Sequence, residues 1–156
     1  MSNFVYLSKE RMRELEKELS KMKTHGRKQM AERIAEARSH GDLSENAEYD
    51  AAKEEQGLLE LRISKLEELL SRATVIDLSN MPKDQAHILS TLKVKNLNNS
   101  KLYTYTLVSP EEADIDKGKI SITSPVGQAL MAAKPGQVVQ ARVPAGVIKF
   151  EVLELE

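Results

Sequence analysis

Apolar residues in the first half of the chain recur with the period of a helix. Met12, Leu15, Leu19 and Met22 follow one another at steps of three and four, and the pattern continues loosely to Ala37. A second run keeps its steps strictly enough to form a heptad seam with one polar member. Its positions are Ala52, Gln56, Leu59, Ile63, Leu66, Leu70 and Ala73. The two runs predict two amphipathic helices.

A short polar segment, residues 39–44, separates the two runs. Gly41 suits the end of the first helix, and Asp42 or Ser44 suits the N-cap of the second. A short connection places two amphipathic helices antiparallel, and about 30 helical residues span about 45 Å, so we expect a long hairpin with this loop at its tip. On periodicity alone such a hairpin is an interaction arm or a dimerisation coil. Gly26 interrupts the first seam and is expected to bend or fray the helix there.

After about residue 75 the hydrophobic period becomes two, which indicates β-strands. Alternating segments occupy residues 92–97, 102–108, 120–122, 138–143 and 147–155. Asn98-Asn99 is typical of a hairpin turn, and Pro125 before Val126–Ala133 predicts one short helix with proline in its first turn. The sequence thus predicts an α+β fold in two domains, an antiparallel helical hairpin at 1–75 and a globular domain at 76–156.

Composition excludes several classes of protein. The 23 basic and 24 acidic residues leave a net charge of −1, which argues against a generally basic nucleic-acid-binding protein. Cysteine is absent, so disulfides, cysteine-based zinc sites and a cysteine nucleophile are excluded. The sequence shows neither a signal peptide nor an apolar run of about 20 residues, and we expect a soluble cytoplasmic protein.

Charge is distributed unevenly along the predicted hairpin. Residues 9–28 carry eight basic residues against four glutamates, whereas residues 41–60 carry seven acidic residues and one lysine. Pairing of opposite charges between facing helices explains most of this pattern.

Two carboxylates of the predicted tip, Asp42 and Glu45, have two interpretations. Their spacing is that of a capping box, in which Asp42 is the N-cap and Glu45 folds back toward it. Carboxylates are also hard oxygen ligands of the kind that Mg²⁺ prefers, although two are too few for a complete octahedral site. The alternative to the cap is therefore that the pair completes a metal site in a partner protein, where a second ion switches on phosphoryl chemistry.

Several long motifs carry a resemblance to a known family. Residues 37–56, ARSHGDLSENAEYDAAKEEQ, closely resemble the tip signature of the Gre transcript-cleavage factors of bacterial RNA polymerase. Residues 111–130, EEADIDKGKISITSPVGQAL, and residues 143–155, VPAGVIKFEVLEL, match the second half of the same family. Leu43 within GDLSEN is similar to the GreA branch of the GreA/GreB family, because the GreB branch usually has arginine there. The resemblance covers almost the whole chain.

The resemblance implies a fold and a mechanism. The fold is an N-terminal antiparallel coiled coil followed by a C-terminal α+β domain similar to FKBP-type folds. Such factors dock on RNA polymerase and pass the coiled coil into its secondary channel, where Asp42 and Glu45 would help to hold Mg²⁺ and a water. The polymerase then hydrolyses its own backtracked transcript and regains an aligned RNA 3′ end. The chain would therefore be no enzyme itself and would bind no cofactor stably, the Mg²⁺ being shared with the polymerase.

The resemblance also assigns roles to further residues. Ser44 lies between the two acids and is a candidate for a contact at the tip. Ser124-Pro125 would bind a coiled coil of the largest polymerase subunit, although the same dipeptide is an ordinary N-cap followed by proline at N1. Arg27 and Lys28 are the best candidates for a basic patch facing the nascent RNA. Lys28 is a departure, since GreA-like sequences often carry Arg-Pro near this position.

Three other functions fit parts of the sequence. A channel-binding regulator of the same shape that does not promote cleavage is expected to alter the tip acids, and here GDLSEN is intact. A prolyl isomerase lines its pocket with aromatic residues, whereas this half of the chain has only Tyr103, Tyr105 and Phe150. A self-sufficient metallonuclease needs more clustered ligands than the sequence offers.

Overall fold

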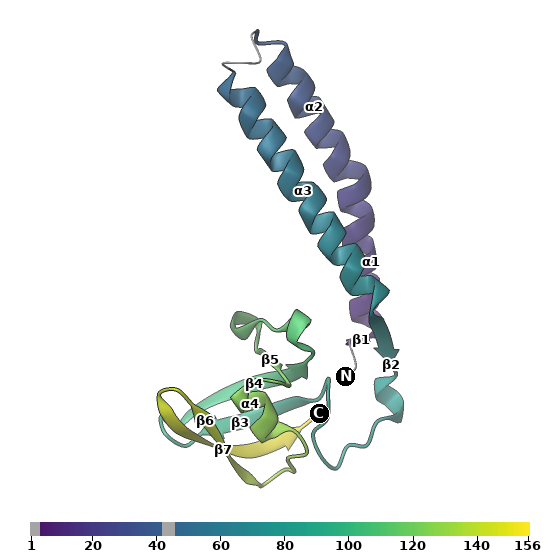
Figure 1. The fold of residues 1–156 in the computed structure, drawn as a ribbon. Helices are drawn as coiled ribbons and strands as arrows, with labels where there is room; N and C mark the ends of the chain where they lie inside the picture. Colours follow the sequence, from purple (N-terminus) through teal and green to yellow (C-terminus); the bar gives the residue numbers. More distant parts are fainter. Residues whose placement is uncertain (1–3, 42–45) are drawn as a thin grey trace. The chain divides into compact units, whose positions relative to one another are not determined.

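The computed structural model describes residues 4–41 and 46–156, which form two units. One unit is Lys9–Ala73, and the other joins the residues up to Ser8 to Thr74–Glu156. The first is a helical hairpin and the second contains a five-stranded sheet with one short α-helix, so the predicted α+β fold class is confirmed (Figure 1). Within the described ranges, no helix is both long and apolar enough to cross a membrane.

The hairpin unit consists of a first arm and a returning helix. The first arm comprises α1 (Lys9–Lys21), the π-helix η1 (Met22–Gly26) and α2 (Arg27–Arg38), and α3 (Ala47–Ser71) returns beside it (Figure 1). The predicted seams are the buried faces of both. The buried positions of this unit among the described residues are Leu15, Ile34, Ala37, Ala52 and Ile63.

A π turn lies where the sequence predicts an interruption. Met22, Gly26, Met30 and Ile34 follow one another at steps of four, whereas the heptad before them alternates steps of three and four. From Met30 onward the seam therefore lies one residue later in the sequence than that heptad predicts. A π-helix closes its hydrogen bonds over five residues and an α-helix over four, and the N–H of Arg27 donates to the carbonyl oxygen of Met22. The wider turn takes up the extra residue and returns Ile34 to the buried face. The expected fraying at Gly26 is therefore wrong, because the segment stays helical.

The strand β1 (Val5–Ser8) was not evident from periodicity. It pairs with β2 (Ala73–Ile76) in a two-stranded sheet, and Val5 and Leu7 are buried. The N–H of Tyr6 donates to Oγ of Ser109 at 3.0 Å, which ties the strand to the globular part of the chain. The boundary predicted at residue 75 assigns this strand to the hairpin, whereas its contacts group it with Thr74–Glu156.

The main sheet has the strand order β5-β4-β3-β7-β6. Its strands are β3 (Thr91–Asn96), β4 (Lys101–Val108), β5 (Lys119–Ser121), β6 (Val138–Val143) and β7 (Gly146–Leu155). The β4–β5 pair is parallel and the other pairs are antiparallel. Short 3-10 turns lie at Leu78–Asn80, Pro110–Glu112 and Ile115–Lys117. The five predicted strand segments are present, the third shifted to Lys119–Ser121.

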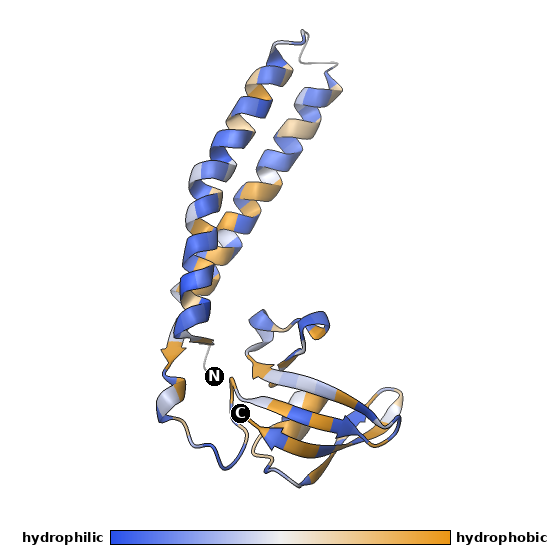
Figure 2. Ribbon diagram, turned by 180° about the vertical axis from the view of Figure 1, so that it is seen from behind, coloured by the Kyte–Doolittle hydropathy of each residue, from blue (hydrophilic) through white to orange (hydrophobic). Residues whose placement is uncertain are grey.

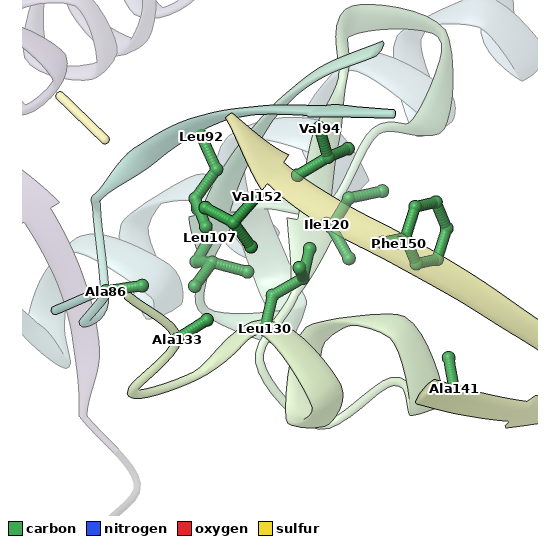
Figure 3. Packing of buried hydrophobic residues seen from close by; sticks show 10 residues of the cluster. All are labelled: Ala86, Leu92, Val94, Leu107, Ile120, Leu130, Ala133, Ala141, Phe150 and Val152. Carbon is green, nitrogen blue, oxygen red and sulfur yellow. The ribbon is translucent and has the colours of Figure 1, made fainter. Parts of the chain in front are cut away.

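The core of this unit lies between one face of the sheet and the helix α4 (Pro125–Leu130). Apolar and hydrophilic residues alternate along the strands, as Figure 2 shows, so that alternate side chains reach this face. The side chains of Leu92, Val94, Leu107 and Val152 meet Leu130 of α4 there (Figure 3). Apolar packing thus holds α4 against the sheet.

The helix α4 ends earlier than the sequence predicts. The expected helix runs to Ala133, but Ala132 has a left-handed backbone with φ +64°. The N–H of Ala132 donates to the carbonyl oxygen of Ala86, and the N–H of Ala86 donates to that of Ala133, both at 2.8 Å. This pairing with a distant segment competes with the last helical turn and ends the helix at Leu130.

Candidate functional site

The predicted tip residues Asp42, Ser44 and Glu45 lie outside the described residues, and their roles stay predictions. The residue that caps the following helix is described. Asn46 is the N-cap of α3, because its Oδ1 accepts from the N–H of Tyr49 at 3.1 Å. Its Nδ2 also donates to the carbonyl oxygen of Ala37 at 2.5 Å. One amide side chain thus begins α3 and joins it to the end of α2.

Because Asn46 is the N-cap, the capping-box interpretation of the tip acids is wrong. Neither Asp42 nor Ser44 is the N-cap of the second helix, because that helix begins at Ala47. Glu45 precedes the cap, so it does not occupy the third helical position that a capping box needs. The sequence signal for Asn46 was present, since asparagine is among the preferred N-cap residues, but it was masked by the two candidates before it.

Two further contacts join the helices near the tip. Nε2 of His40 lies 3.4 Å from a carboxylate oxygen of Glu48. The guanidinium of Arg38 lies 5.9 Å from the centre of the Tyr49 ring, within the range of a cation–π interaction. Together with Asn46 these contacts hold the end of α2 beside the start of α3. They fix the two helix ends that the tip residues connect.

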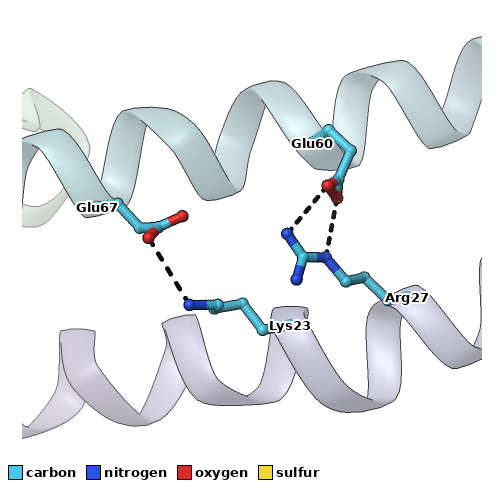
Figure 4. A network of polar contacts seen from close by, with 4 residues as sticks. All are labelled: Lys23, Arg27, Glu60 and Glu67. Carbon is cyan, nitrogen blue, oxygen red and sulfur yellow. Dashed lines mark hydrogen bonds and ion pairs between the residues drawn. The ribbon is translucent and has the colours of Figure 1, made fainter.

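Ion pairs of one polarity run along the hairpin. Nζ of Lys23 lies 3.7 Å from Glu67, and Nη2 and Nε of Arg27 donate to the two carboxylate oxygens of Glu60 at 3.0 and 3.1 Å (Figure 4). Arg33 pairs with Glu55 nearer the tip. In each pair the cation is on the first arm and the carboxylate is on α3. The predicted pairing of charges between facing helices is confirmed for these residues.

The two residues predicted to face RNA have different surroundings. The hydrogen bond to Glu60 raises the pKa of Arg27 above its usual value, so this guanidinium is held by a carboxylate of its own chain. Lys28 is exposed. No finding tests whether either residue contacts RNA, and that role stays a prediction.

Ser124 and Pro125 form the start of α4. Oγ of Ser124 accepts from the N–H of Gly127 at 3.0 Å and donates to the carbonyl oxygen of Ser121 at 2.6 Å. Pro125 occupies the first turn, where its missing N–H costs nothing. The N-cap interpretation of this dipeptide is therefore confirmed. Its docking role stays a prediction.

Side chains that ligate metals do not cluster in residues 4–41 and 46–156. This part of the chain contains no group of three or more His, Cys, Asp or Glu side chains that could hold an ion. Asp42 and Glu45 fall outside it. Their oxygen donors suit Mg²⁺ in kind, but two carboxylates do not fill its octahedral coordination, so the donor set fits a site shared with a partner.

Comparison with known proteins agrees with the fold. The family described as "Transcription elongation factor, N-terminal" matches residues 5–75, and "Transcription elongation factor, GreA/GreB, C-term" matches residues 81–156. Transcription elongation factor GreA of Chloroherpeton thalassium is 48% identical over 156 residues, covering 100% of this chain and 99% of that protein. GreA of Amoebophilus asiaticus is 50% identical, covering 99% of both chains.

One solved structure is also similar over the whole length. The crystal structure of GreA factor homolog 1 of Thermus thermophilus is 26% identical and covers 99% of both chains, with a TM-score of 0.46. Family membership rests on the two family matches and the full-length relatives. The two family matches together cover residues 5–75 and 81–156. The chain belongs to the GreA/GreB family of transcription elongation factors.

Proposed function

We propose that this chain enters the secondary channel of bacterial RNA polymerase and stimulates the polymerase's own hydrolysis of a backtracked RNA 3′ end. Family membership supports an elongation factor that acts on RNA polymerase. The intact GDLSEN motif supports the cleavage-stimulating type. The cleaved transcript regains an aligned 3′ end, which rescues an arrested complex.

The observation that carries this proposal is the capping of α3 by Asn46. An N-cap side chain is occupied by backbone N–H groups of its own helix and has little capacity left for an external ligand. Because Asn46 does this work, the carboxylates of Asp42 and Glu45 are not required as the cap. The start of α3 therefore places no structural demand on these two acids, which is what a role toward a partner requires.

The chain would supply ligands, and the polymerase would supply the active site. The oxygens of Asp42 and Glu45 would complete the coordination of Mg²⁺ together with groups of the polymerase, and Ser44 would contact the same site. A shared Mg²⁺ would lower the pKa of a bound water and so favour its deprotonation to a hydroxide nucleophile. The chain needs no cofactor of its own for this role and would not cleave RNA by itself.

Other parts of the chain would bind the complex. The dipeptide Ser124-Pro125 would dock on a coiled coil of the largest polymerase subunit, where a capped helix start offers a rigid contact. Lys28 is exposed on the first arm and suits the phosphates of extruded RNA. Each contact adds affinity or orientation, and neither takes part in hydrolysis.

The test uses purified polymerase halted in a backtracked complex with end-labelled RNA and Mg²⁺. We expect the wild-type chain to shorten the transcript, and Asp42→Asn or Glu45→Gln to lower the maximal cleavage rate by about 100-fold, since each removes a metal ligand. Polymerase binding and unfolding free energy should change little. Glu54→Gln is the matched control, because it makes the same chemical change in an exposed carboxylate of α3 outside the ion pairs between the helices.

Two outcomes would refute the proposal. If the wild-type chain binds the polymerase without any cleavage, it is a regulator that occupies the channel. If Asp42→Asn and Glu45→Gln cleave as fast as Glu54→Gln, the tip acids hold no catalytic ion.

A further inference from the structure

Arg27 lies at the middle of the hairpin, where the apolar seam between the helices is weakest. Gly26 brings no side chain to the seam, and a methyl group added there would lie 3.4 Å from Cδ1 of Leu59. One turn toward the tip, α3 places Gln56 in its heptad seam. Packing of large apolar side chains normally sets the register of two helices. Little of it is available at Gly26 and Gln56, so a polar contact beside them can add to the register that the buried residues Ile34 and Ile63 favour.

The ion pair of Arg27 with Glu60 has the geometry for this task. Nε and Nη2 of the guanidinium reach the two oxygens of one carboxylate at 3.1 and 3.0 Å. Such a planar, two-bond arrangement specifies both distance and orientation, unlike a single contact from a lysine. The π turn ends at Gly26, immediately before Arg27. Its extra residue changes which face of the first arm points toward α3, and Arg27 is the first residue after this change. Figure 4 shows the arginine reaching across from the first arm to α3.

The neighbours of Glu60 make the contact selective for one register. On α3 the residues one helical turn from it are Gln56, Gly57, Ile63 and Ser64, so a slip of one turn in either direction would leave the guanidinium without a carboxylate. Lys23 with Glu67 and Arg33 with Glu55 repeat the same polarity on either side. An isolated exposed ion pair contributes little, but a two-bond arginine contact within a series of pairs is the exception.

We propose that Arg27 and Glu60 are positioning residues that set the register of the hairpin and thereby place Asp42 and Glu45 for cleavage. This inference rests on the proposed function. It gives Arg27 a role different from the RNA contact that its charge and position suggest in the sequence. The guanidinium of Arg27 would act indirectly, by fixing the position of α3, whereas the tip acids would act directly at the site of RNA cleavage.

The first test measures register in the free full-length chain. Because the sequence has no cysteine, Ser39→Cys and Asp50→Cys introduce two unique sites for spin labels on either side of the tip. Pulsed electron resonance then gives the distribution of distances between them. We expect a narrow distribution in the otherwise wild-type chain, a broad one with Arg27→Glu or Glu60→Arg, and a narrow one again when both changes are combined.

The second test measures cleavage of the backtracked complex as a function of factor concentration. Arg27→Glu and Glu60→Arg should each lower the maximal rate about three- to fivefold, with an unchanged half-saturating concentration. The charge-swapped double variant should recover to within about twofold of wild type. Lys65→Glu and Glu54→Arg are matched controls, because they make the same charge changes at exposed positions of α3 outside the three ion pairs.

Each outcome decides between two roles for Arg27. If Glu60→Arg keeps the full rate while Arg27→Glu and the double variant are equally slow, Arg27 contacts RNA and the proposal falls. If neither single change alters the distances or the rate, the pair sets no register. If the wild-type chain stimulates no cleavage, the proposed function fails, and the spin-label distances alone decide whether the pair sets the register.

Discussion

Gly127 is the position in the globular unit where a single methyl group should do most damage. It lies buried in α4, and its N–H is the group that Ser124 caps. A Cβ built on Gly127 would lie 1.9 Å from the carbonyl oxygen of Ser121 and 3.0 Å from Cα of Ile122. Carbon and carbonyl oxygen atoms normally approach to about 3.3 Å at closest, so α4 or β5 would have to move by more than 1 Å.

The cost follows from what this movement breaks. The carbonyl oxygen of Ser121 accepts both from Oγ of Ser124 at 2.6 Å and from its N–H at 3.1 Å. Overfilling a packed interior costs about 1–3 kcal/mol, and an obstacle that is backbone cannot rotate away. We therefore expect Gly127→Ala to lower the unfolding free energy of this unit by about 3 kcal/mol. The shifted Ser124-Pro125 should also raise the factor concentration that half-saturates polymerase.

Gly57 provides the matched control in the other unit. It is exposed within α3, and a Cβ built there meets no atom within 4 Å. Glycine inside a helix costs about 0.5–1 kcal/mol relative to alanine, chiefly through the flexibility of the unfolded chain. Gly57→Ala should therefore stabilise the hairpin by about 0.5–1 kcal/mol. The same chemical change thus has opposite signs in two helices of one chain.

Urea unfolding with hydrogen-exchange mass spectrometry distinguishes the two effects, because peptides from α3 and β7 report on different units. Gly127→Ala should lower the midpoint for β7 and leave that for α3 near wild type, and Gly57→Ala should raise the midpoint for α3. An unchanged β7 midpoint in Gly127→Ala would refute the steric argument. It would mean that α4 shifts freely on the sheet and that its start is not held rigidly for docking.

Three further predictions concern the unit that contains the five-stranded sheet. Ser124→Ala should lower the unfolding free energy of this unit by about 1 kcal/mol through loss of the α4 cap, as a urea titration would show. Pro125→Ala should raise the half-saturating factor concentration without changing the maximal cleavage rate, as a titration of the factor in the cleavage assay would show. Burial raises the pKa of Tyr105, and repulsion from the negative charge of an ionised Tyr103 nearby raises it further, so folding favours the protonated phenol. Stability from this group is complete below about pH 10 and falls as the pH rises through the raised value, and Tyr105→Phe should flatten that fall in alkaline urea titrations.

The elements of this protein were largely predictable from its sequence. The heptad positions from Ala52 to Leu70 are the buried or half-buried face of α3, and the alternation at 92–97 is β3. The turn at Asn98-Asn99 and the start of α4 at Pro125 also lie where expected. These features are local, because periodicity and turn chemistry depend on residues only a few positions apart.

The candidate site was predictable in its chemistry and only partly in its geometry. The tip motif identifies Asp42 and Glu45, but spacing alone assigns them to a capping box that Asn46 replaces. Arg27 stands out in sequence as a basic residue beside Lys28. The structure shows its carboxylate partner, Glu60, which is 33 positions away along the chain.

By itself the sequence determined the helical hairpin, the α+β second half, the family and the two acids of the tip. Only the tertiary structure decided that β1 pairs with β2, that α4 yields its last turn to the pairing with Ala86, and that Arg27 binds Glu60. The physical reason is the same in each case. Secondary structure follows from the local periodicity of the sequence, whereas these contacts join segments far apart in the chain. Several segments have the same local propensity to be the partner, and tertiary packing selects one of them.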